Sequence, residues 1–482
     1  MYRCCCFAAL AACFASVLSC HSNTTGVQPI GTDSVTIHGH DWVRFGWDVG
    51  RSSASTAPTG ITASNVGSMV RQQVTIPGTV DASAIYLSNI QVGGVAHDVF
   101  FVTTTYGKTV AINANTGVVL WTYTPANYNS WAGSAQITTA TPVADPGRDY
   151  IYAASPDGNI QKLAVSDGHA LWSTPITLGP QSEKIASALN YFAGHVFATT
   201  GGYVGDAPPY QGHLVILDAN SGQVLHVWNS LCSNQSALIA PSSCAQSGSA
   251  IWGRGGAVID SATGDIYVAM GNGLWDGSTN WGDALVRLDS SATHILGNYT
   301  PTNTGSLDST DQDLGSTSPA LLGNGYLAQG GKDGLIRVLS IAGTAGATPH
   351  EGGEAQVTPT PSQTDLFGSF AVWQAMNGTT IFGADSRGTA AWTFSGGTLT
   401  LAWHSSNVGT TPVVAGGLLF VFDQGGNGLR VYQPATGTQI TALPSAVGHW
   451  NSPIVADGRI AVPEGSANDH ASSGILDIYR LP

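Results

Sequence analysis

The chain has 482 residues, of which 61 are glycine, 23 are proline and 13 are tryptophan. Its 16 lysines and arginines, against 30 aspartates and glutamates, give a formal net charge of −14, so no basic stripe could follow a nucleic-acid backbone. The chain is too long for one ordinary hydrophobic core, yet no charged run or Pro/Ser-rich linker divides it. These features argue against nucleic-acid binding and predict one turn-rich domain over residues 41–482.

Residues 1–19 are typical of a secretory signal peptide. Arg3 precedes an apolar run, from Cys4 to Leu18, which is too short to span a bilayer and ends in small residues. We predict that this segment is removed on export and that residues 20–40 form a flexible N-terminal segment.

The end of the signal also approximates a bacterial lipobox, Val-Leu-Ser-Cys, whose last residue is Cys20. In a lipoprotein, cleavage would leave Cys20 as the lipidated N-terminus; the alternative is plain secretion. We therefore predict an exported bacterial protein, either periplasmic or a membrane-anchored lipoprotein, with no membrane contact other than lipid on Cys20.

A short pattern recurs along the chain: β-prone residues, a turn centred on glycine, and a hydrophobic strand that often ends in tryptophan. The turn glycines are Gly117, Gly168, Gly222 and Gly437, and the first three are followed by Trp121, Trp172 and Trp228. Because every repeat is a hairpin, the pattern predicts an all-β array of the propeller type.

A second recurring element, an opening of small residues before a β-prone run, allows the blades to be counted. The openings begin at Ser83, Thr141, Ser187, Gly255, Ser318, Ser369, Thr411 and Ser452. Eight openings predict an eight-bladed β-propeller of four-stranded antiparallel blades, with seven blades as the alternative count. We expect the last strand, Ile475–Arg480, to pair with residues near Trp42–Val49 and so close the ring.

Four of the seven cysteines lie within the signal, which leaves Cys20, Cys232 and Cys244. Two cysteines twelve positions apart in an exported loop predict the disulfide Cys232–Cys244, with a stabilisation of roughly 3 kcal/mol from loop entropy. Metal ligation by this pair is not favoured, because no other thiol or nearby histidine completes a tetrahedral set. Cys20 is then the lipid site or part of the removed peptide.

Candidate functional residues concentrate in the middle of the chain. They are Trp252 in Ile-Trp-Gly-Arg-Gly, Asn272 in Gly-Asn-Gly, Asp283 in Trp-Gly-Asp, and Lys332 in Gly-Lys-Asp-Gly. Each also has a structural interpretation: packing for the tryptophan, a tight turn for the asparagine, and turn or hairpin roles for the aspartate and the lysine. The chain has no two-histidine metalloprotease spacing and no P-loop, which argues against zinc hydrolase and nucleotide chemistry.

At these residues the chain resembles the pyrroloquinoline-quinone (PQQ) repeat propellers, the superfamily of the quinoprotein alcohol dehydrogenases, and looks most similar to a branch of exported bacterial proteins. The resemblance covers nearly the whole chain after the signal. It implies that Trp252 is the floor under PQQ, Asn272 an amide ligand of calcium, Asp283 the base, and Lys332 the cation that contacts the quinone oxygens. These residue types suit stacking, a hard cation, proton abstraction and carbonyl polarisation, respectively.

Two departures from that family weigh against catalysis. Where the dehydrogenases place a calcium-ligating glutamate, residues 201–212 contain none and offer only Asp206 as a substitute. The adjacent-cysteine disulfide that covers the cofactor in many of those enzymes is also missing, and the loss of an anionic ligand weakens calcium binding. We therefore favour a non-catalytic binding or scaffold protein, whose propeller face binds a protein, a glycan or a small molecule. The alternative is a PQQ- and calcium-dependent dehydrogenase that oxidises an alcohol or a sugar.

Overall fold

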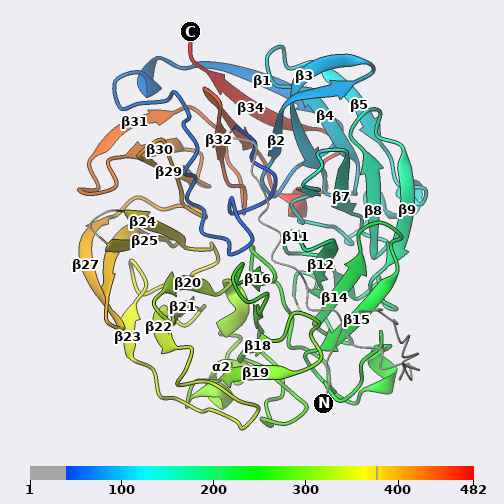
Figure 1. Cartoon of the computed structure of the whole chain (residues 1–482), viewed down its shortest axis with the longest axis vertical. Coiled ribbons are helices and arrows are strands. Elements are labelled where there is room, and N and C mark those ends of the chain that lie inside the picture. Colours follow the sequence, from blue (N-terminus) through cyan, green and yellow to red (C-terminus); the bar gives the residue numbers. More distant parts are fainter. Residues whose placement is uncertain (1–39, 206, 376–377) are drawn as a thin grey trace, which may run out of the picture. The chain divides into compact units, whose positions relative to one another are not determined.

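Eight four-stranded antiparallel sheets follow one another around an axis in the computed structural model, which describes residues 40–205, 207–375 and 378–482 (Figure 1). The protein is an eight-bladed β-propeller, so the count of eight is confirmed. Each small-residue opening lies two or three residues before the first strand of a blade. No helix in the described part of the chain is long and apolar enough to cross a membrane.

The first four blades follow the chain from residue 85 to residue 299. Blade 1 consists of β2 (Ile85–Val92), β3 (Val95–Thr103), β4 (Thr109–Asn113) and β5 (Val119–Tyr123). Blade 2 consists of β6 (Val143–Ala144), β7 (Tyr150–Ala154), β8 (Asn159–Ala164) and β9 (Ala170–Pro175). Blade 3 consists of β11 (Asn190–Phe192), β12 (His195–Thr199), β14 (His213–Asp218) and β15 (Val224–Asn229). Blade 4 consists of β16 (Val258–Ile259), β17 (Ile266–Ala269), β18 (Leu285–Leu288) and β19 (Ile295–Tyr299).

The other four blades complete the ring. Blade 5 consists of β20 (Ala320–Gly323), β21 (Tyr326–Gly330), β22 (Leu335–Ser340) and β23 (Gln356–Pro359). Blade 6 consists of β24 (Ala371–Ala375), β25 (Gly378–Ala384), β26 (Thr389–Ser395) and β27 (Thr398–Ser405). Blade 7 consists of β28 (Val413–Ala415), β29 (Leu418–Asp423), β30 (Gly428–Tyr432) and β31 (Gln439–Leu443). Blade 8 consists of β32 (Ile454–Ala456), β33 (Arg459–Pro463), β34 (Gly474–Arg480) and β1 (Val70–Ile76).

Short elements lie in the connections between these strands. A two-stranded sheet pairs β10 (Glu183–Lys184) with β13 (Gly201–Gly202). The helical turns are η1 (Val66–Ser68), α1 (Tyr128–Trp131), η2 (Pro241–Ser243), α2 (Thr304–Ser309), η3 (Leu314–Ser316) and η4 (Ala467–Asp469).

Tryptophans on fourth strands pack against turn glycines of the next blade. A Cβ atom on Gly168 would lie 2.5 Å from the indole of Trp121, and one on Gly222 would lie 2.6 Å from the indole of Trp172. Both glycines have a positive φ, 77° and 73°, which side-chain-bearing residues rarely adopt. Trp121 also donates from Nε1 to the carbonyl of Val165, at 2.9 Å. The recurring glycine turn and tryptophan therefore mark the contact between successive blades.

The ring closes through its last strand, as predicted, but the predicted partner is wrong. The strand β34 pairs with β1, in a register that runs from Val70↔Arg480 to Ile76↔Gly474. Residues Trp42–Val49 are almost all buried, and the chain turns there through a positive φ at Trp47. The outer strand of a blade has one face exposed to solvent. β1 has both exposed and buried residues and meets this requirement, whereas Trp42–Val49 is almost entirely buried and does not.

Residues 41–55, called here the axial segment, cross the middle of the ring (blue in Figure 1). Backbone hydrogen bonds connect the axial segment to the first strands of blades 1, 2, 4, 6 and 7, at Tyr86, Ala144, Ile259, Val372 and Val414. Arg44 adds a bond to Asn190 on the first strand of blade 3, at 2.8 Å. The axial segment thus fastens blades that are far apart in the sequence.

Candidate functional site

A cavity of about 240 Å³ opens on the axis, where the connections into several first strands converge. Its aromatic lining comes from Tyr203, Trp252 and Trp450, and its basic lining comes from Lys184, Arg254, Lys332 and His449. Gly255, next to Arg254, accepts a hydrogen bond from Arg51 of the axial segment, at 2.9 Å. The axial segment therefore lies directly behind the cavity.

Two of the aromatic lining residues, Trp252 and Trp450, are connected through Phe367. The ring centroid of Phe367 lies 6.0 Å from that of Trp252 and 4.6 Å from that of Trp450. Trp450 in turn contacts the imidazole of His449, with centroids 4.3 Å apart. These rings come from connections of three different blades, so the aromatic surface exists only in the closed propeller.

Lys332 places a cation beside the indole of Trp252. Its Nζ lies 5.4 Å from the ring centroid, pairs with Asp311 at 3.0 Å, and contacts the carboxylate of Asp313. Burial lowers the pKa of Lys332, but these two carboxylates more than offset it, so that the pKa is raised above its ordinary value. The side chain, 13% exposed, is therefore a charged ammonium at neutral pH.

Asn272 lies behind this cation through its backbone. Its N–H donates to Oδ1 of Asp313 at 2.6 Å, and its carbonyl accepts from Ser249 N at 2.6 Å. The backbone of Asn272 thus helps to fix the Asp313 carboxylate, and its side chain is not part of the cavity lining.

Asp283 is fully buried and is not part of the cavity lining. Its Oδ1 accepts from Leu314 N at 2.9 Å, while its Oδ2 has no hydrogen-bond partner in the described chain. Burial, together with the negative charge of Asp313, raises the pKa of Asp283 to about 8, although the Leu314 N–H and Lys332 oppose this rise. The carboxylate that contacts Lys332 is therefore that of Asp313, and Asp283 lies behind it.

The structure thus brings two of the four central candidates, Trp252 and Lys332, into one cavity. Asp206 and Cys20 lie outside the described residues, as do the predicted signal at 1–19 and nearly all of the segment at 20–40. Sequence reasoning did not single out Arg254 or His449, because no local motif marks them.

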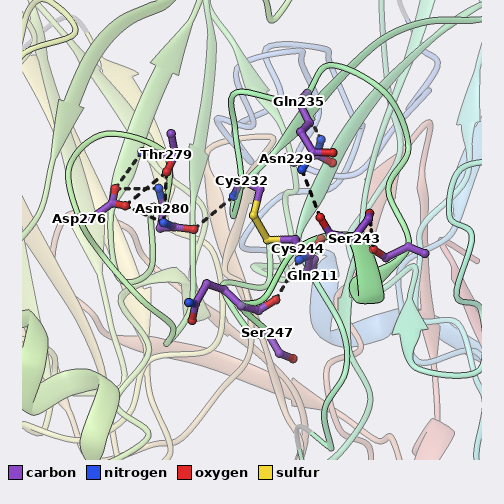
Figure 2. Close-up of a disulfide and its surroundings, with 12 residues drawn as sticks. Gln211, Asn229, Cys232, Gln235, Ser243, Cys244, Ser247, Asp276, Thr279 and Asn280 are labelled. Atoms are coloured by element: carbon purple, nitrogen blue, oxygen red, sulfur yellow. Dashed lines mark hydrogen bonds between the residues drawn. A yellow bond between two sulfur atoms is a disulfide. The ribbon is translucent and has the colours of Figure 1, made fainter.

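The disulfide supports one wall of the cavity. Cys232 and Cys244 are bonded, with Cα atoms 6.1 Å apart (Figure 2). Beside them, Gln211 donates from Nε2 to the carbonyl of Gln246 at 2.9 Å, which ties the disulfide loop to the connection that carries Tyr203. This cross-link therefore acts on the connection that supplies part of the lining.

Comparison with known proteins agrees with the repeat pattern. A sequence model of the PQQ_2 family, described as outer membrane protein assembly factor BamB, matches residues 53–230 and 95–267. The fold resembles the quinohemoprotein alcohol dehydrogenase of Comamonas testosteroni, with a TM-score of 0.68 and 16% identity over 94% of this chain and 82% of that one. The chain is a PQQ-repeat β-propeller.

Two further proteins that are similar to this PQQ-repeat propeller, one in fold and one in sequence, are dehydrogenases by name. A europium-containing methanol dehydrogenase superposes with a TM-score of 0.69 at 14% identity, over 92% of this chain and 99% of that one. A polyvinylalcohol dehydrogenase of a Pseudomonas species is 27% identical over 262 residues, which are 51% of this chain. The match spans only 38% of that relative's length. The structural matches establish the fold, and activity does not follow from fold alone.

The described residues do not fit a calcium site. No group of three or more His, Cys, Asp or Glu side chains within the described ranges could hold a metal ion. The carboxylate beside Asn272 is that of Asp313, which accepts the Asn272 N–H and pairs with Lys332, so an ammonium already lies where a metal ion would bind this carboxylate. Calcium prefers six to eight oxygen ligands, and the positive charge of the ammonium opposes its binding here.

The cavity does fit the organic part of the family's cofactor. PQQ is a planar aromatic ring system with carboxylates, and the lining supplies the indole of Trp252 and the ammonium of Lys332. Aromatic faces bind planar rings and cations bind carboxylates. The ring system of PQQ could therefore stack on Trp252, and a carboxylate of PQQ could pair with Lys332.

Proposed function

We propose that this PQQ-repeat propeller is an exported binding protein whose axial cavity takes a small organic anion with a flat, apolar part. The observation that carries the proposal is the Lys332 ammonium beside the Trp252 indole in an axial cavity. An aromatic face next to a fixed cation suits a ligand that is apolar on one side and anionic on the other.

The charge of the cavity supports an anionic ligand. Arg254 is buried, and its guanidinium donates to three backbone carbonyls, those of Asp81, Thr139 and Ala186, instead of to a carboxylate. Burial lowers the pKa of Arg254, although Asp81 partly opposes this, and a guanidinium stays protonated at neutral pH. Its positive charge therefore adds to that of Lys332 at the cavity.

A binding role is favoured over catalysis because the chemistry of the site is incomplete. The Lys332 ammonium neutralises Asp313, and Asp283 has no contact with the cavity. Neither carboxylate is thus available to take a proton from a ligand. Export is supported by the signal-like N-terminus of the sequence and by the Cys232–Cys244 disulfide, which is typical of oxidising compartments.

The second candidate is a PQQ-dependent dehydrogenase that oxidises an alcohol or a sugar. One observation favours it: the carboxylate and the ammonium of the Asp313–Lys332 pair lie next to the indole expected under the quinone. The relatives named as dehydrogenases are consistent with this candidate. Asp206, outside the described residues, would have to supply a missing calcium ligand.

A titration of the purified protein with PQQ, followed by tryptophan fluorescence, tests the proposal. We expect saturable quenching without added calcium, at least tenfold weaker binding in Lys332→Met, and no dye-linked oxidation of alcohols or sugars. Lys108→Met is the matched control, because its ammonium also lies over an aromatic ring, that of Tyr128, but outside the cavity lining. Calcium-dependent binding with dye reduction would favour the dehydrogenase. Failure of both PQQ and simple aromatic carboxylates to bind would exclude the proposed function.

A further inference from the structure

An aspartate–histidine pair borders the cavity, and the hydrogen bond between its side chains has not been used above. Nδ1 of His449 lies 2.7 Å from Oδ2 of Asp81, although the two residues are 368 positions apart in the sequence. Asp81 is fully buried, whereas the imidazole is 30% exposed and lines the cavity. Asp81 precedes the first strand of blade 1 and His449 precedes that of blade 8, so the pair forms only when the ring closes.

The surroundings of Asp81 keep it ionised. Its Oδ1 accepts from Trp450 N at 2.8 Å, and its Oδ2 accepts from Ala467 N at 3.1 Å. Burial alone would raise the pKa of Asp81, but the hydrogen bond and charge of His449, with help from Arg254 and Ala467, lower it below its ordinary value. An ionised carboxylate can only accept hydrogen bonds.

The ionised carboxylate fixes the tautomer of His449. Because Asp81 can only accept, Nδ1 of His449 must carry a hydrogen, and in the neutral imidazole Nε2 then has a free lone pair. Within the described ranges, the hydrogen bond of the imidazole is made at Nδ1, which leaves Nε2 on the other side of the ring. The exposed edge of the ring therefore presents an acceptor at the cavity.

We propose that His449 Nε2 is the proton acceptor of the axial cavity, oriented by Asp81, and that the ligand presents a hydroxyl group to it. This inference rests on the proposed function and narrows the ligand to a hydroxyl-bearing organic anion. The ligand O–H donates to Nε2. When the proton passes, the ligand oxygen keeps the electron pair, an N–H bond forms at Nε2, and the Asp81 carboxylate balances the imidazolium charge.

Charged groups of both signs face His449. Asp81 is the anion in contact with it, while Lys184, Arg254 and Lys332 bring positive charge to the same cavity. A protonated imidazole has no lone pair at Nε2, so the hydroxyl preference requires the neutral ring. Attraction of the ligand carboxylate by the lysines and the arginine does not depend on that lone pair.

The tautomer is tested first, without any ligand, by NMR of the full chain labelled with nitrogen-15 histidine. We expect a hydrogen on Nδ1 and none on Nε2 of neutral His449. In Asp81→Asn, the new amide N–H₂ can donate to Nδ1, and we expect the hydrogen to move to Nε2. His169 is the matched control, because its contact with Asp167, at 2.6 Å, lies on the surface and must not change. A hydrogen on Nε2 in the wild type would overturn the inference.

The ligand class is tested by comparing 4-hydroxybenzoate with benzoate, which differ by one hydroxyl group. At pH 8 we expect the wild type to bind 4-hydroxybenzoate about fivefold more tightly, as one additional hydrogen bond predicts. His449→Phe and Asp81→Asn should bind both acids equally, whereas His169→Phe should keep the preference. Equal binding by the wild type would overturn the inference and leave the proposed function standing. Failure of the wild type to bind either acid would overturn the proposed function and the hydroxyl ligand together.

Discussion

The axial segment and the cavity lie next to each other on the propeller axis, and each contains a cation, but the two cations have different partners. Arg51, in the axial segment, donates to four backbone carbonyls, those of Phe45, Ala188, Leu189 and Gly255, at 2.7–3.3 Å. At the cavity, the cation is a partly exposed ammonium, Lys332, in contact with side-chain carboxylates and an indole.

The different partners of Arg51 and Lys332 indicate different roles, a structural role for Arg51 and a ligand-binding role for Lys332. A guanidinium whose hydrogen bonds all end on fixed carbonyls cannot turn toward a ligand, so Arg51 holds strands together. An ammonium that borders a cavity can exchange a carboxylate partner for a carboxylate of a ligand. We therefore expect the axial segment to govern stability and the cavity to govern binding.

The largest expected effect is at Arg51. Arg51→Met removes every donor to four buried carbonyls, which should lower the free energy of unfolding by about 3–5 kcal/mol. Urea unfolding measures this loss, and Arg387→Met, on an exposed side chain, is the control with no expected change. A loss below about 1 kcal/mol would show that the axial segment does not hold the ring together.

The next largest loss of stability is expected at the contact between blades. Gly168→Ala would force a Cβ to within 2.5 Å of Trp121 at a residue whose φ is 77°, so we expect a loss of about 2–4 kcal/mol. Gly194→Ala has a similar φ of 81° but meets no atom within 4 Å, and should cost only about 1 kcal/mol. Equal losses in thermal unfolding would contradict the assigned role of the tryptophan.

The stability that the closing strand pair gives to the ring should depend on pH. Asp477, on β34, pairs with Arg71 of β1. Burial, together with the neighbouring Glu464, raises the pKa of Asp477 to about 7, although Arg71 opposes this rise. A raised carboxyl pKa favours folding below the ordinary value near 4, and that stability is lost as the pH rises toward 7. We expect the wild type to lose about 1–2 kcal/mol between pH 4.5 and pH 7.5 relative to Asp477→Asn, measured by urea unfolding. Parallel pH profiles of the two proteins would contradict this.

The smallest effect is expected at Asp283 in acid. Because its pKa is raised to about 8, Asp283 stays protonated in the folded protein at pH 4, where Asp283→Asn should change stability by less than about 0.5 kcal/mol. As the pH rises from 4 toward 8, the unfolded chain ionises this group and the folded protein does not, so the wild type should become the less stable of the two. Calorimetric unfolding at pH 4 and pH 8 compares them. A wild type that is more stable than the variant at pH 8 would mean that the ionised carboxylate has a partner.

Local patterns in the sequence were enough to predict the blades. The glycine turns, the strand-ending tryptophans and the small openings act over about ten residues, and each corresponds to a hairpin or a first strand. The closing partner was wrong because Trp42–Val49 and Val70–Ile76 both contain β-prone residues, so the sequence does not tell which of them is the outer strand. Only the packing shows that the first segment is buried on the axis and the second is an outer strand.

The site was less predictable than the fold, because its residues meet through the ring closure. Asp81 and His449 lie near opposite ends of the chain, so no spacing could join them. Several acids occur between residues 283 and 313, and only the folded structure shows that Asp313, and not Asp283, contacts Lys332. Trp252 and Lys332, which line the cavity, could be singled out as candidates because they belong to glycine-flanked turns typical of the family.

The most direct test of the central claim, that the axial cavity binds an organic anion, is a crystal structure of the protein soaked with PQQ in the absence of calcium. We predict electron density for a planar ring beside Trp252, with a carboxylate within hydrogen-bond distance of Lys332 Nζ. A cavity without ligand density at saturating PQQ, or density only on the outer surface of the blades, would contradict the claim.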